Sequence, residues 1–226
     1  MKHKNKNRFD DGFQAYLTEN ANFSGKPKMP EIVVMHNESI PKSLIPFSKI
    51  RTSNNKRGYI HFYIHDKLFG NFIADVKSYI PLLTQYDGVI TPDCSMANGQ
   101  LDYLQMTNTY FNRAVGVYLQ KQGISVIPTV RWSDESSFAY CFNGLPINSI
   151  VAISTHGCIK SNDQKAMFRN GLIRMLETLH PKDVIVYGYM PKNIFGGLEE
   201  LTNFHRYPNH FETNCRKDYN NYGKLL

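Results

Sequence analysis

The sequence is poor in the residues and motifs that would define a class of protein at once. Its 226 residues include four cysteines and one tryptophan. The cysteines show no Cys-x-x-Cys spacing, which indicates free thiols in a reducing compartment. There is no Walker A loop, no Gly-x-Gly-x-x-Gly, no His-Glu-x-x-His and no Gly-x-Ser-x-Gly. The most recognisable nucleotide-binding, metalloprotease and hydrolase signatures are therefore excluded.

Long hydrophobic runs are also missing. No window is apolar over the length of a membrane span, and no charged segment precedes an apolar stretch as in a secretory signal. We therefore expect a cytoplasmic protein with no membrane partner. The hydrophobic content of 42% and the aromatic content of 13% argue against global disorder. The length suits one domain with an extension.

Positive charge is concentrated near the start of the chain. Residues 1–60 hold 11 Lys and Arg against 5 Asp and Glu, whereas residues 61–226 hold 15 against 14. The basic residues form two groups: Lys2, Lys4, Lys6 and Arg8, then Lys42, Lys49, Arg51, Lys56 and Arg57. Such asymmetry is typical of a segment that binds a polyanion such as nucleic acid, and equally of a solvated tail and loop.

The pattern of apolar residues predicts alternating strands and helices. Continuous apolar runs indicate strands at 59–64, 88–91, 124–130, 149–154 and 184–188, with a short strand candidate at 31–35. Helical periodicity indicates helices at 76–86, 104–123 and 164–181. Uninterrupted apolar strands are typical of a parallel sheet that is covered on both faces.

These elements predict an α/β fold with a mostly parallel sheet built from successive βα units. Because a full eight-unit barrel needs about 250 residues, we expect an open or incomplete barrel-like sheet. We divide the chain into a basic, partly irregular N-terminal extension packed on the domain (1–57), an α/β core domain (58–194) and a polar C-terminal tail (195–226).

Polar residues follow each predicted strand. Ligands of parallel α/β sheets bind beyond the carboxyl ends of the strands, so these residues are candidates for a site. They are, in chain order, His65 and Asp66; Asp93; Arg131, Trp132, Asp134 and Glu135; Ser154, Thr155, His156 and Gly157; and Tyr187 with Gly188.

Several chemistries suit these residue types. The candidate catalytic residues are Asp93, His156, Asp66 and Glu135. Together with Asp134, the carboxylates could bind a divalent metal such as Mg²⁺. His156 suits a general acid or base at neutral pH.

The candidate binding residues are Arg131, Trp132, Asp134, Ser154, Thr155 and Gly157. Arg131 suits a phosphate, and Trp132 is either a stacking platform or a core anchor. The stretch Ser154–Gly157 either cradles phosphate on its N–H groups or forms an ordinary strand-to-helix turn.

Several blocks carry a family resemblance: HFYIHD, YDGVITPDCSM, NTYFNRAVGVYLQKQGISVIPTVRW, VIVYG, and YCFNGLPINSIVAIST followed after one residue by GC. Over roughly residues 40–190 they resemble an uncharacterised family of bacteria, phages and mobile elements, the domain of unknown function 4417. The resemblance implies a phage or mobile-element setting and no reaction. The family often has paired acids after its first strand, where this chain has His65 and Asp66, which puts a metal role there in doubt.

The leading hypothesis is an enzyme that acts on a nucleotide or nucleic acid, with the chemistry at the strand ends and the basic segment on the backbone. One alternative is a non-enzymatic protein that binds nucleic acid or a host protein. A further alternative is a glycosidase-like enzyme that uses Asp93 and a second carboxylate. The sequence does not define the oligomeric state.

Overall fold

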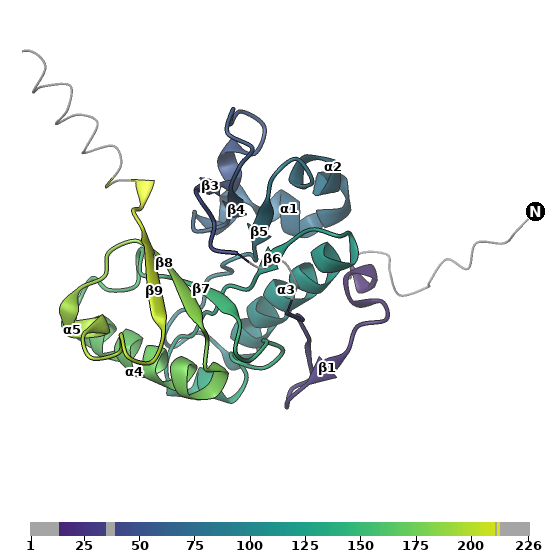
Figure 1. Cartoon of the computed structure of the whole chain (residues 1–226). Helices are drawn as coiled ribbons and strands as arrows, with labels where there is room; N and C mark the ends of the chain where they lie inside the picture. Colours follow the sequence, from purple (N-terminus) through teal and green to yellow (C-terminus); the bar gives the residue numbers. More distant parts are fainter. Residues whose placement is uncertain (1–13, 35–38, 211, 213–226) are drawn as a thin grey trace, which may run out of the picture.

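Parallel strands form the centre of the molecule (Figure 1). The computed structural model of the chain describes residues 14–34, 39–210 and 212. The parallel strands in these ranges are β3 (Leu44–Pro46), β4 (Tyr59–His61), β5 (Gly88–Ile90), β6 (Val126–Ile127), β7 (Ile150–Ser154), β8 (Asp183–Tyr187) and β9 (Asn203–Tyr207). The first four pair in chain order, and so do the last three. A parallel bridge between Thr129 and Ala152 joins the two groups, so spatial order follows chain order throughout.

The sheet curls around an interior of its own. One cluster of buried side chains draws on every parallel strand and consists of Tyr59, Tyr63, Ile90, Ile127, Ile150, Ala152, Ile185 and Tyr187, with Ile40, Leu44 and Tyr207 packed against it. The hydroxyl of Tyr207 donates to the carbonyl of Pro41, so the last strand lies close to the segment before the first. The predicted α/β class with a mostly parallel sheet is confirmed, and its layout is that of an incomplete barrel.

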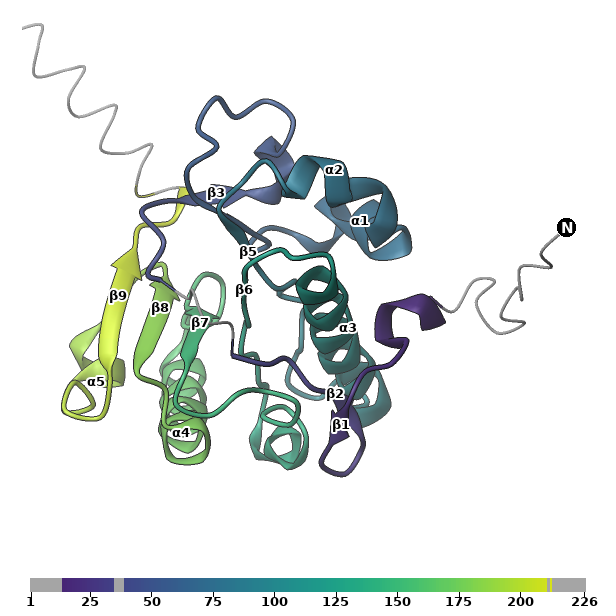
Figure 2. The ribbon, with the colours of Figure 1, turned by 45° about the vertical axis from the view of Figure 1, so that its right-hand side comes forward.

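Helices cover the outer face of the sheet. They are α1 (Gly70–Ala74), α2 (Ile80–Leu83), α3 (Asp102–Lys121), α4 (Asn162–Leu179) and α5 (Lys192–Phe195), with single 3-10 turns at η1 (Ala15–Thr18), η2 (Phe47–Lys49), η3 (Asp66–Leu68), η4 (Val76–Tyr79) and η5 (Glu135–Ala139). Helix α3 lies alongside β6, and α4 packs on β7 and β8 (Figure 2). None of the helices in the described ranges is long and apolar enough to cross a membrane.

Local sequence explains the ends of α4. The side chain of Ser161 accepts from the N–H of Gln164 while the Gln164 side chain accepts from the N–H of Ser161, which is a reciprocal cap. His180 takes a left-handed conformation after the last turn, and Pro181 cannot continue the helix. The predicted boundary at residues 164–181 therefore lies within two residues of the observed one.

The structure corrects the edges of the predicted layout. Residues 31–34 form no strand: the N–H of Ile32 donates to the carbonyl of Gly144, and both backbone groups of Val33 bond the side chain of Gln120. A small antiparallel hairpin precedes them, β1 (Phe23–Ser24) with β2 (Met29–Pro30). The parallel sheet also extends beyond residues 58–194, because β3 lies in the predicted extension and β9 in the predicted tail.

Candidate functional site

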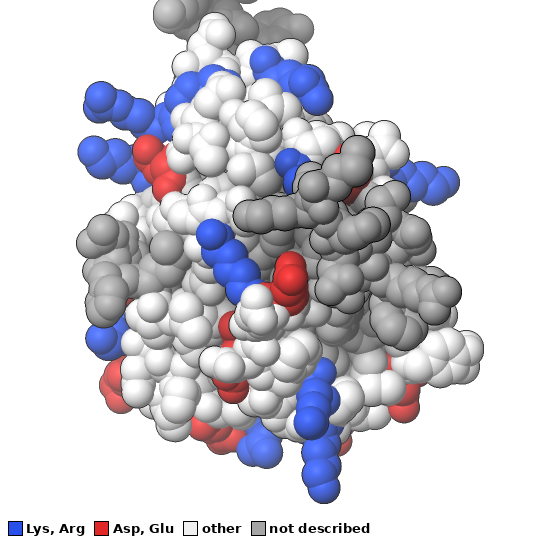
Figure 3. Space-filling view, turned by 90° about the vertical axis from the view of Figure 1, so that its right-hand side faces the viewer, with Lys and Arg blue, Asp and Glu red and all other residues white. Residues whose placement is uncertain are grey.

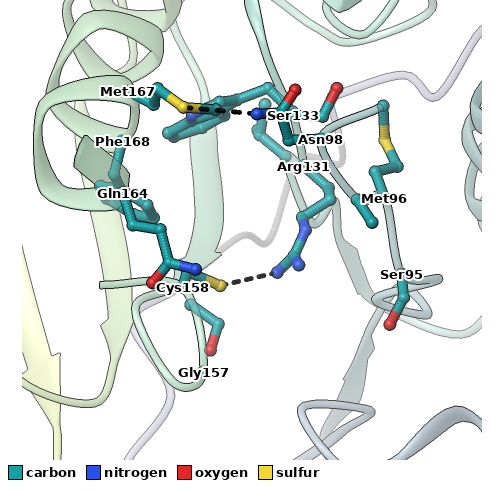
Figure 4. A pocket seen from close by; sticks show the side chains of 14 residues that line it. Ser95, Met96, Asn98, Arg131, Ser133, Gly157, Cys158, Gln164, Met167 and Phe168 are labelled. Carbon is teal, nitrogen blue, oxygen red and sulfur yellow. Dashed lines mark hydrogen bonds between the residues drawn. The ribbon is translucent and has the colours of Figure 1, made fainter. Parts of the chain in front are cut away.

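Two charged side chains meet beyond the carboxyl ends of the strands, and two more ionisable residues lie near enough to influence them. Asp93 follows β5 and Arg131 follows β6; the Arg131 Nη1 lies 3.4 Å from the Asp93 Oδ2. Asp66 follows β4 and His156 follows β7, and both act electrostatically on Asp93. The Nη1 of Arg131 also donates to the Sγ of Cys158 at 3.0 Å (Figure 4). The predicted convergence of strand ends therefore holds for these residues.

The ion pair between Arg131 and Asp93 is nearly closed to solvent yet incompletely bonded. The two side chains are 23% and 12% exposed. Neither the Nε of Arg131 nor the Oδ1 of Asp93 has a hydrogen-bond partner among the described residues, although both atoms are buried. Each unsatisfied buried group costs about 1–3 kcal/mol, so two at one point demand a functional or structural explanation.

Burial and neighbouring charges set the protonation of this cluster. Burial raises the pKa of Asp93; Arg131 opposes the shift, and Asp66 adds to it. Burial disfavours the charge of Arg131, but Asp93 and Cys158 outweigh it and raise the pKa of Arg131 overall. Burial and then Lys160 lower the pKa of His156. A permanent cation thus lies beside a carboxyl group and an imidazole that can each exchange a proton.

Asp66 also forms hydrogen bonds that hold the loop after Asp93. Its two carboxylate oxygens accept from the hydroxyl and the N–H of Ser95, at 2.9 and 3.1 Å. The side chain of Asn108, on α3, donates to the carbonyl of Ser95 at 2.6 Å. These bonds fix the loop that follows Asp93, so Asp66 acts on the cluster through its charge and through this loop.

The turn after β7 is both a structural turn and a wall of the site. The N–H of Cys158 donates to the carbonyl of Thr155 at 3.1 Å, and Gly157 has a φ of +78°, as a tight turn of this kind requires. Ser154 accepts from the N–H of His156 at 3.1 Å. Thr155 is buried and donates to the carbonyl of Tyr189 at 2.8 Å. Ser154–Gly157 thus forms a strand-to-helix turn, and the hydroxyl groups of Ser154 and Thr155 form hydrogen bonds that hold it. Its binding of phosphate stays a prediction.

A cleft of about 450 Å³ opens beside Arg131 (Figure 4). We call it the arginine cleft. Its lining combines polar groups with an apolar wall and includes Arg131, Ser133, Ser154, Cys158, Gln164, Met96, Trp132, Met167 and Phe168. Arg131 points across it toward the turn that carries Gly157 and Cys158. A pocket of this size with few polar groups and an apolar wall is typical of small-ligand sites.

Trp132 is chiefly a core anchor. It is 7% exposed, and its ring centroid lies 5.0 Å from that of Phe168. A Cβ at Gly171, on α4, would collide with the indole, so the helix approaches the ring as closely as glycine allows. The same residue borders the arginine cleft, which leaves it a limited part in binding.

Asp134 and Glu135 do not join the cluster. They lie at the start of η5 and line a separate hollow with Phe138, Met167 and Asn170. The Asp134 side chain caps that turn by accepting from the N–H and the hydroxyl of Ser136. Although they follow Arg131 by only three and four residues, they line a hollow that does not include it.

The predicted set of metal ligands is accordingly incomplete. Among the residues that the structure describes, no group of three or more His, Cys, Asp or Glu could hold a metal ion. Asp93 pairs with Arg131, and both carboxylate oxygens of Asp66 accept hydrogen bonds from Ser95. The described residues therefore do not fit a resident Mg²⁺.

Two α3 residues that sequence reasoning missed hold the strand ends in place. Arg113 is 1% exposed and donates to the carbonyls of Asn143, Cys141 and Thr129. Asn112 donates to the carbonyl of Pro92 at 2.7 Å, one residue before Asp93. An arginine within the apolar stretch RAVGV was the available signal, because a charged residue on a buried helix face needs several partners.

Three rings lie beneath the cluster in the barrel interior. His61 is 1% exposed, and its ring centroid lies 4.5 Å from that of Tyr187, which stacks on Tyr63 at 5.1 Å. Burial lowers the pKa of His61 to about 3, so its imidazole is neutral. The hydroxyl of Tyr63 lies 3.3 Å from that of Thr129, two residues before Arg131. Packed aromatic rings thus fill the barrel interior next to the strand ends.

Only the second group of basic residues near the start of the chain lies in the part that the structure describes. Lys2, Lys4, Lys6 and Arg8 lie outside the described residues. In the second group, Lys56 lies over the ring of Tyr86 and donates to its hydroxyl at 2.8 Å. Figure 3 shows Lys and Arg scattered over one face of the molecule, with uncharged and acidic residues between them. The polyanion-binding role of this segment stays a prediction.

The cysteines follow the expected pattern where they can be seen. Cys94, Cys141 and Cys158 are free thiols, and Cys215 lies outside the described residues. Burial raises the pKa of Cys158, and Arg131 opposes the shift. Cys158 is therefore a polar contact for Arg131 more than a reactive thiolate.

Comparison with known proteins gives relatives but no reaction. The chain is 32% identical over 133 residues to the Gene 1 protein of Mycobacterium phage L5, a match that covers 59% of this chain and 58% of the relative. It is 33% identical over 131 residues to the Gene 1 protein of Mycobacterium phage D29, covering 58% and 48%. The chain thus spans about half the length of these relatives. No solved structure matches it.

The family can nevertheless be stated. Its model matches residues 21–207, which include all nine strands and all five α-helices named above. The match also contains Asp66, Asp93, Arg131 and His156. The chain belongs to the family described as domain of unknown function 4417.

Proposed function

We propose that this protein is an intracellular phage or mobile-element enzyme that acts on the phosphate-bearing part of a nucleotide or nucleic acid. The observation that carries the proposal is the buried pair of Arg131 and Asp93, each with an unsatisfied polar atom, beside the arginine cleft. Buried polar atoms without partners are most readily explained where a ligand completes their bonding.

The cleft offers complementary surfaces to a nucleotide. The guanidinium of Arg131 suits a phosphate, because its fork of donors matches two phosphate oxygens. The wall formed by Met96, Met167 and Phe168 suits the face of a base. A volume of about 450 Å³ accommodates a ligand of mononucleotide size.

The proton chemistry falls to Asp93 and His156. Burial raises the pKa of Asp93 toward the range in which a general base works at neutral pH. Arg131 opposes this rise in the pKa of Asp93, and a phosphate bound to Arg131 would offset its effect. The pKa of Asp93 would then rise further, and its carboxylate would become a stronger base toward a water or hydroxyl nucleophile. His156 is neutral, because its pKa is lowered, and it can accept or return the proton at the leaving group.

Calorimetry tests whether the protein binds nucleoside mono-, di- and triphosphates. Chromatography of the same mixtures after incubation tests whether the bound nucleotide is converted to a product. The wild type should bind at least one of these ligands. Arg131→Met should weaken binding by about 10- to 150-fold, the worth of hydrogen bonds to a charged group. Arg174→Met is the matched control, because the Arg174 side chain is 59% exposed and pairs with Glu177 on the surface of α4.

Arg131→Lys separates a binding defect from a folding defect, since it keeps the charge that faces Asp93. If Arg131→Met is unfolded by circular dichroism, Arg131→Lys should still bind more weakly than the wild type, because a lysine lacks the planar fork. No nucleotide binding by the wild type, or equal binding by Arg131→Lys and the wild type, would overturn the proposal.

A further inference from the structure

A second cleft, of about 350 Å³, lies on the other side of the turn after β7. We call it the tyrosine cleft. Its lining consists of Thr155, His156, Gly157, Ile159, Lys165, Tyr189, Pro191 and Asn209. Gly157 borders both this cleft and the arginine cleft, so the two are separated only by the turn. A ligand that occupies one can continue into the other across Gly157, where no side chain stands in the way.

Tyr189 gives the tyrosine cleft an exposed aromatic surface on a fixed backbone. The residue is 60% exposed although it lies only two positions after Tyr187, the buried end of β8. The hydroxyl of Thr155 donates to the carbonyl of Tyr189 at 2.8 Å, and the side chain of Arg206 donates to the carbonyl of Gly188 at 3.0 Å. Arg206 also lies 5.9 Å from the Tyr189 ring centroid. An exposed ring held in this way is typical of a stacking platform for a base.

A positive charge completes the cleft. Lys165 lies in the first turn of α4, is partly buried, and forms no ion pair with any residue in the described ranges. A lysine at the first turn of a helix adds to the positive end of the helix dipole and so faces an unfavourable field. A phosphate in the cleft relieves this repulsion. The tyrosine cleft therefore combines a base platform and a phosphate contact, as the arginine cleft does.

We propose that the two clefts hold successive nucleotides of one single-stranded nucleic acid, with the backbone crossing Gly157. This inference rests on the proposed function and names its substrate as an oligonucleotide instead of a mononucleotide. Stacking on an aromatic side chain tolerates any base, so the tyrosine cleft supplies affinity without selecting sequence. His156 borders the tyrosine cleft, and Asp93 pairs with Arg131 of the arginine cleft, so the proposed proton chemistry falls at the junction of the two nucleotides.

Binding as a function of ligand length tests the proposal with the full chain. Fluorescence anisotropy would compare labelled single-stranded oligothymidylate and oligouridylate of two to eight nucleotides, with unlabelled thymidine and uridine monophosphate as competitors. Oligonucleotides should bind at least tenfold more tightly than the monophosphates. Tyr189→Leu should weaken oligonucleotide binding by about 5- to 150-fold, the worth of one stacked base, and leave monophosphate binding unchanged.

Matched variants separate stacking, charge and folding. Tyr189→Phe keeps the ring and should bind as the wild type does. Lys165→Gln should weaken oligonucleotide binding and flatten its dependence on salt. Lys182→Gln is the charge control, because Lys182 is exposed and precedes β8 at the opposite end of the strand.

The outcomes distinguish the two proposals. If monophosphates bind through Arg131 but neither length nor Tyr189→Leu changes affinity, the oligonucleotide inference fails and the proposed function stands. If oligonucleotides bind through Tyr189 but Arg131→Lys has no effect, the second cleft is supported and the role of Arg131 fails. If no nucleotide of any length binds, both are overturned.

Discussion

The two ends of the parallel strands treat polar groups in opposite ways. At the amino ends, the hydroxyl of Tyr59 lies 2.8 Å from that of Ser125, and the imidazole of His205 lies 2.7 Å from the carboxylate of Asp183. These groups satisfy one another. At the carboxyl ends, Arg131 and Asp93 are more buried than the His205–Asp183 pair and yet leave atoms without partners.

This difference in hydrogen bonding is informative because each end of the same sheet carries a pair of a basic residue with an aspartate. Burying a charge destabilises the fold unless the charge is paired and its hydrogen bonds are complete. A buried pair that serves stability is therefore expected to be fully hydrogen-bonded. The ion pair at the amino end meets this expectation, and the ion pair at the carboxyl end does not. The unsatisfied end is therefore where we expect ligand binding, and four experiments can break or sharpen this contrast.

The largest expected effect is on turnover. Asp93→Asn should lower the kcat for any nucleotide substrate by about 10²- to 10⁴-fold, since it removes the proposed general base. Asp183→Asn, the same change at the amino end, should leave kcat unaltered. Steady-state kinetics with purified variants provide the measurement. Equal losses in the two variants would show that the ends do not differ in function.

Arg113→Met should cause the largest loss of stability. The change leaves the carbonyls of Asn143 and Cys141 without this donor, while the carbonyl of Thr129 keeps its bond from Asn112. Each unsatisfied group costs about 1–3 kcal/mol, so we expect the free energy of unfolding to fall by at least about 2 kcal/mol in urea titrations. Arg174→Met, on the exposed face of α4, should change it by less than about 0.5 kcal/mol. A similar small change in Arg113→Met would remove its role in holding the carboxyl ends.

The pH dependence of stability should report His61. Its folded pKa of about 3 lies below the ordinary value of 6.5, so the unfolded chain takes up the proton first as the pH falls. The contribution of the neutral imidazole to the free energy of unfolding is complete above pH 6.5. It decreases as the pH falls toward 3, by up to about 5 kcal/mol. His61→Asn should flatten the curve of unfolding free energy against pH across this window.

His65→Asn is a close control for this measurement. The Nδ1 of His61 accepts from the N–H of Tyr63 at 3.2 Å, and the Nδ1 of His65 accepts from the N–H of Lys67 at the same distance. His61 is buried and His65 is exposed. If both variants change the curve equally, burial is not the cause of the pH dependence.

The smallest effect should come from the amino-end pair. The side chains of His205 and Asp183 are 33% and 24% exposed, and partly solvated pairs contribute at most about 1 kcal/mol. His205→Gln should therefore lower the free energy of unfolding by no more than that amount and leave nucleotide binding unchanged. Thermal or urea denaturation gives the first value and calorimetry the second. Loss of binding would mean that the amino end also takes part in function.

The sequence predicts the central strands well because burial on both faces leaves a plain apolar signal. Residues 150–153 and 184–187 are of this kind, and both strands appear as expected. The strand β9 carries no such signal: its residues Asn203–Tyr207 are polar or aromatic and only partly buried. Its pairing with β8 comes from tertiary contact, which local pattern does not encode.

The site was predictable to the extent that strand ends define it. Asp93, Arg131 and His156 follow β5, β6 and β7, and parallel strands bring such positions together. Asp134 was not separable from Arg131 by sequence, because the direction of the intervening η5 turn depends on its caps. Arg113 was hidden within a helix whose other buried residues are mostly apolar. The glycosidase alternative stays a prediction, as does a role in binding a host protein.

The chain-order arrangement of the strands has a consequence for biosynthesis. Each parallel strand from β4 to β8 lies between its predecessor and its successor, so a growing chain can add one unit at a time. The candidate site is complete only after several units have formed, because its four ionisable residues follow four successive strands. They are Asp66, Asp93, Arg131 and His156. A nascent chain that stops before β7 would hold the arginine without the turn that faces it. The arginine cleft would thus form only when α4, which supplies Gln164 and Phe168, had also been made.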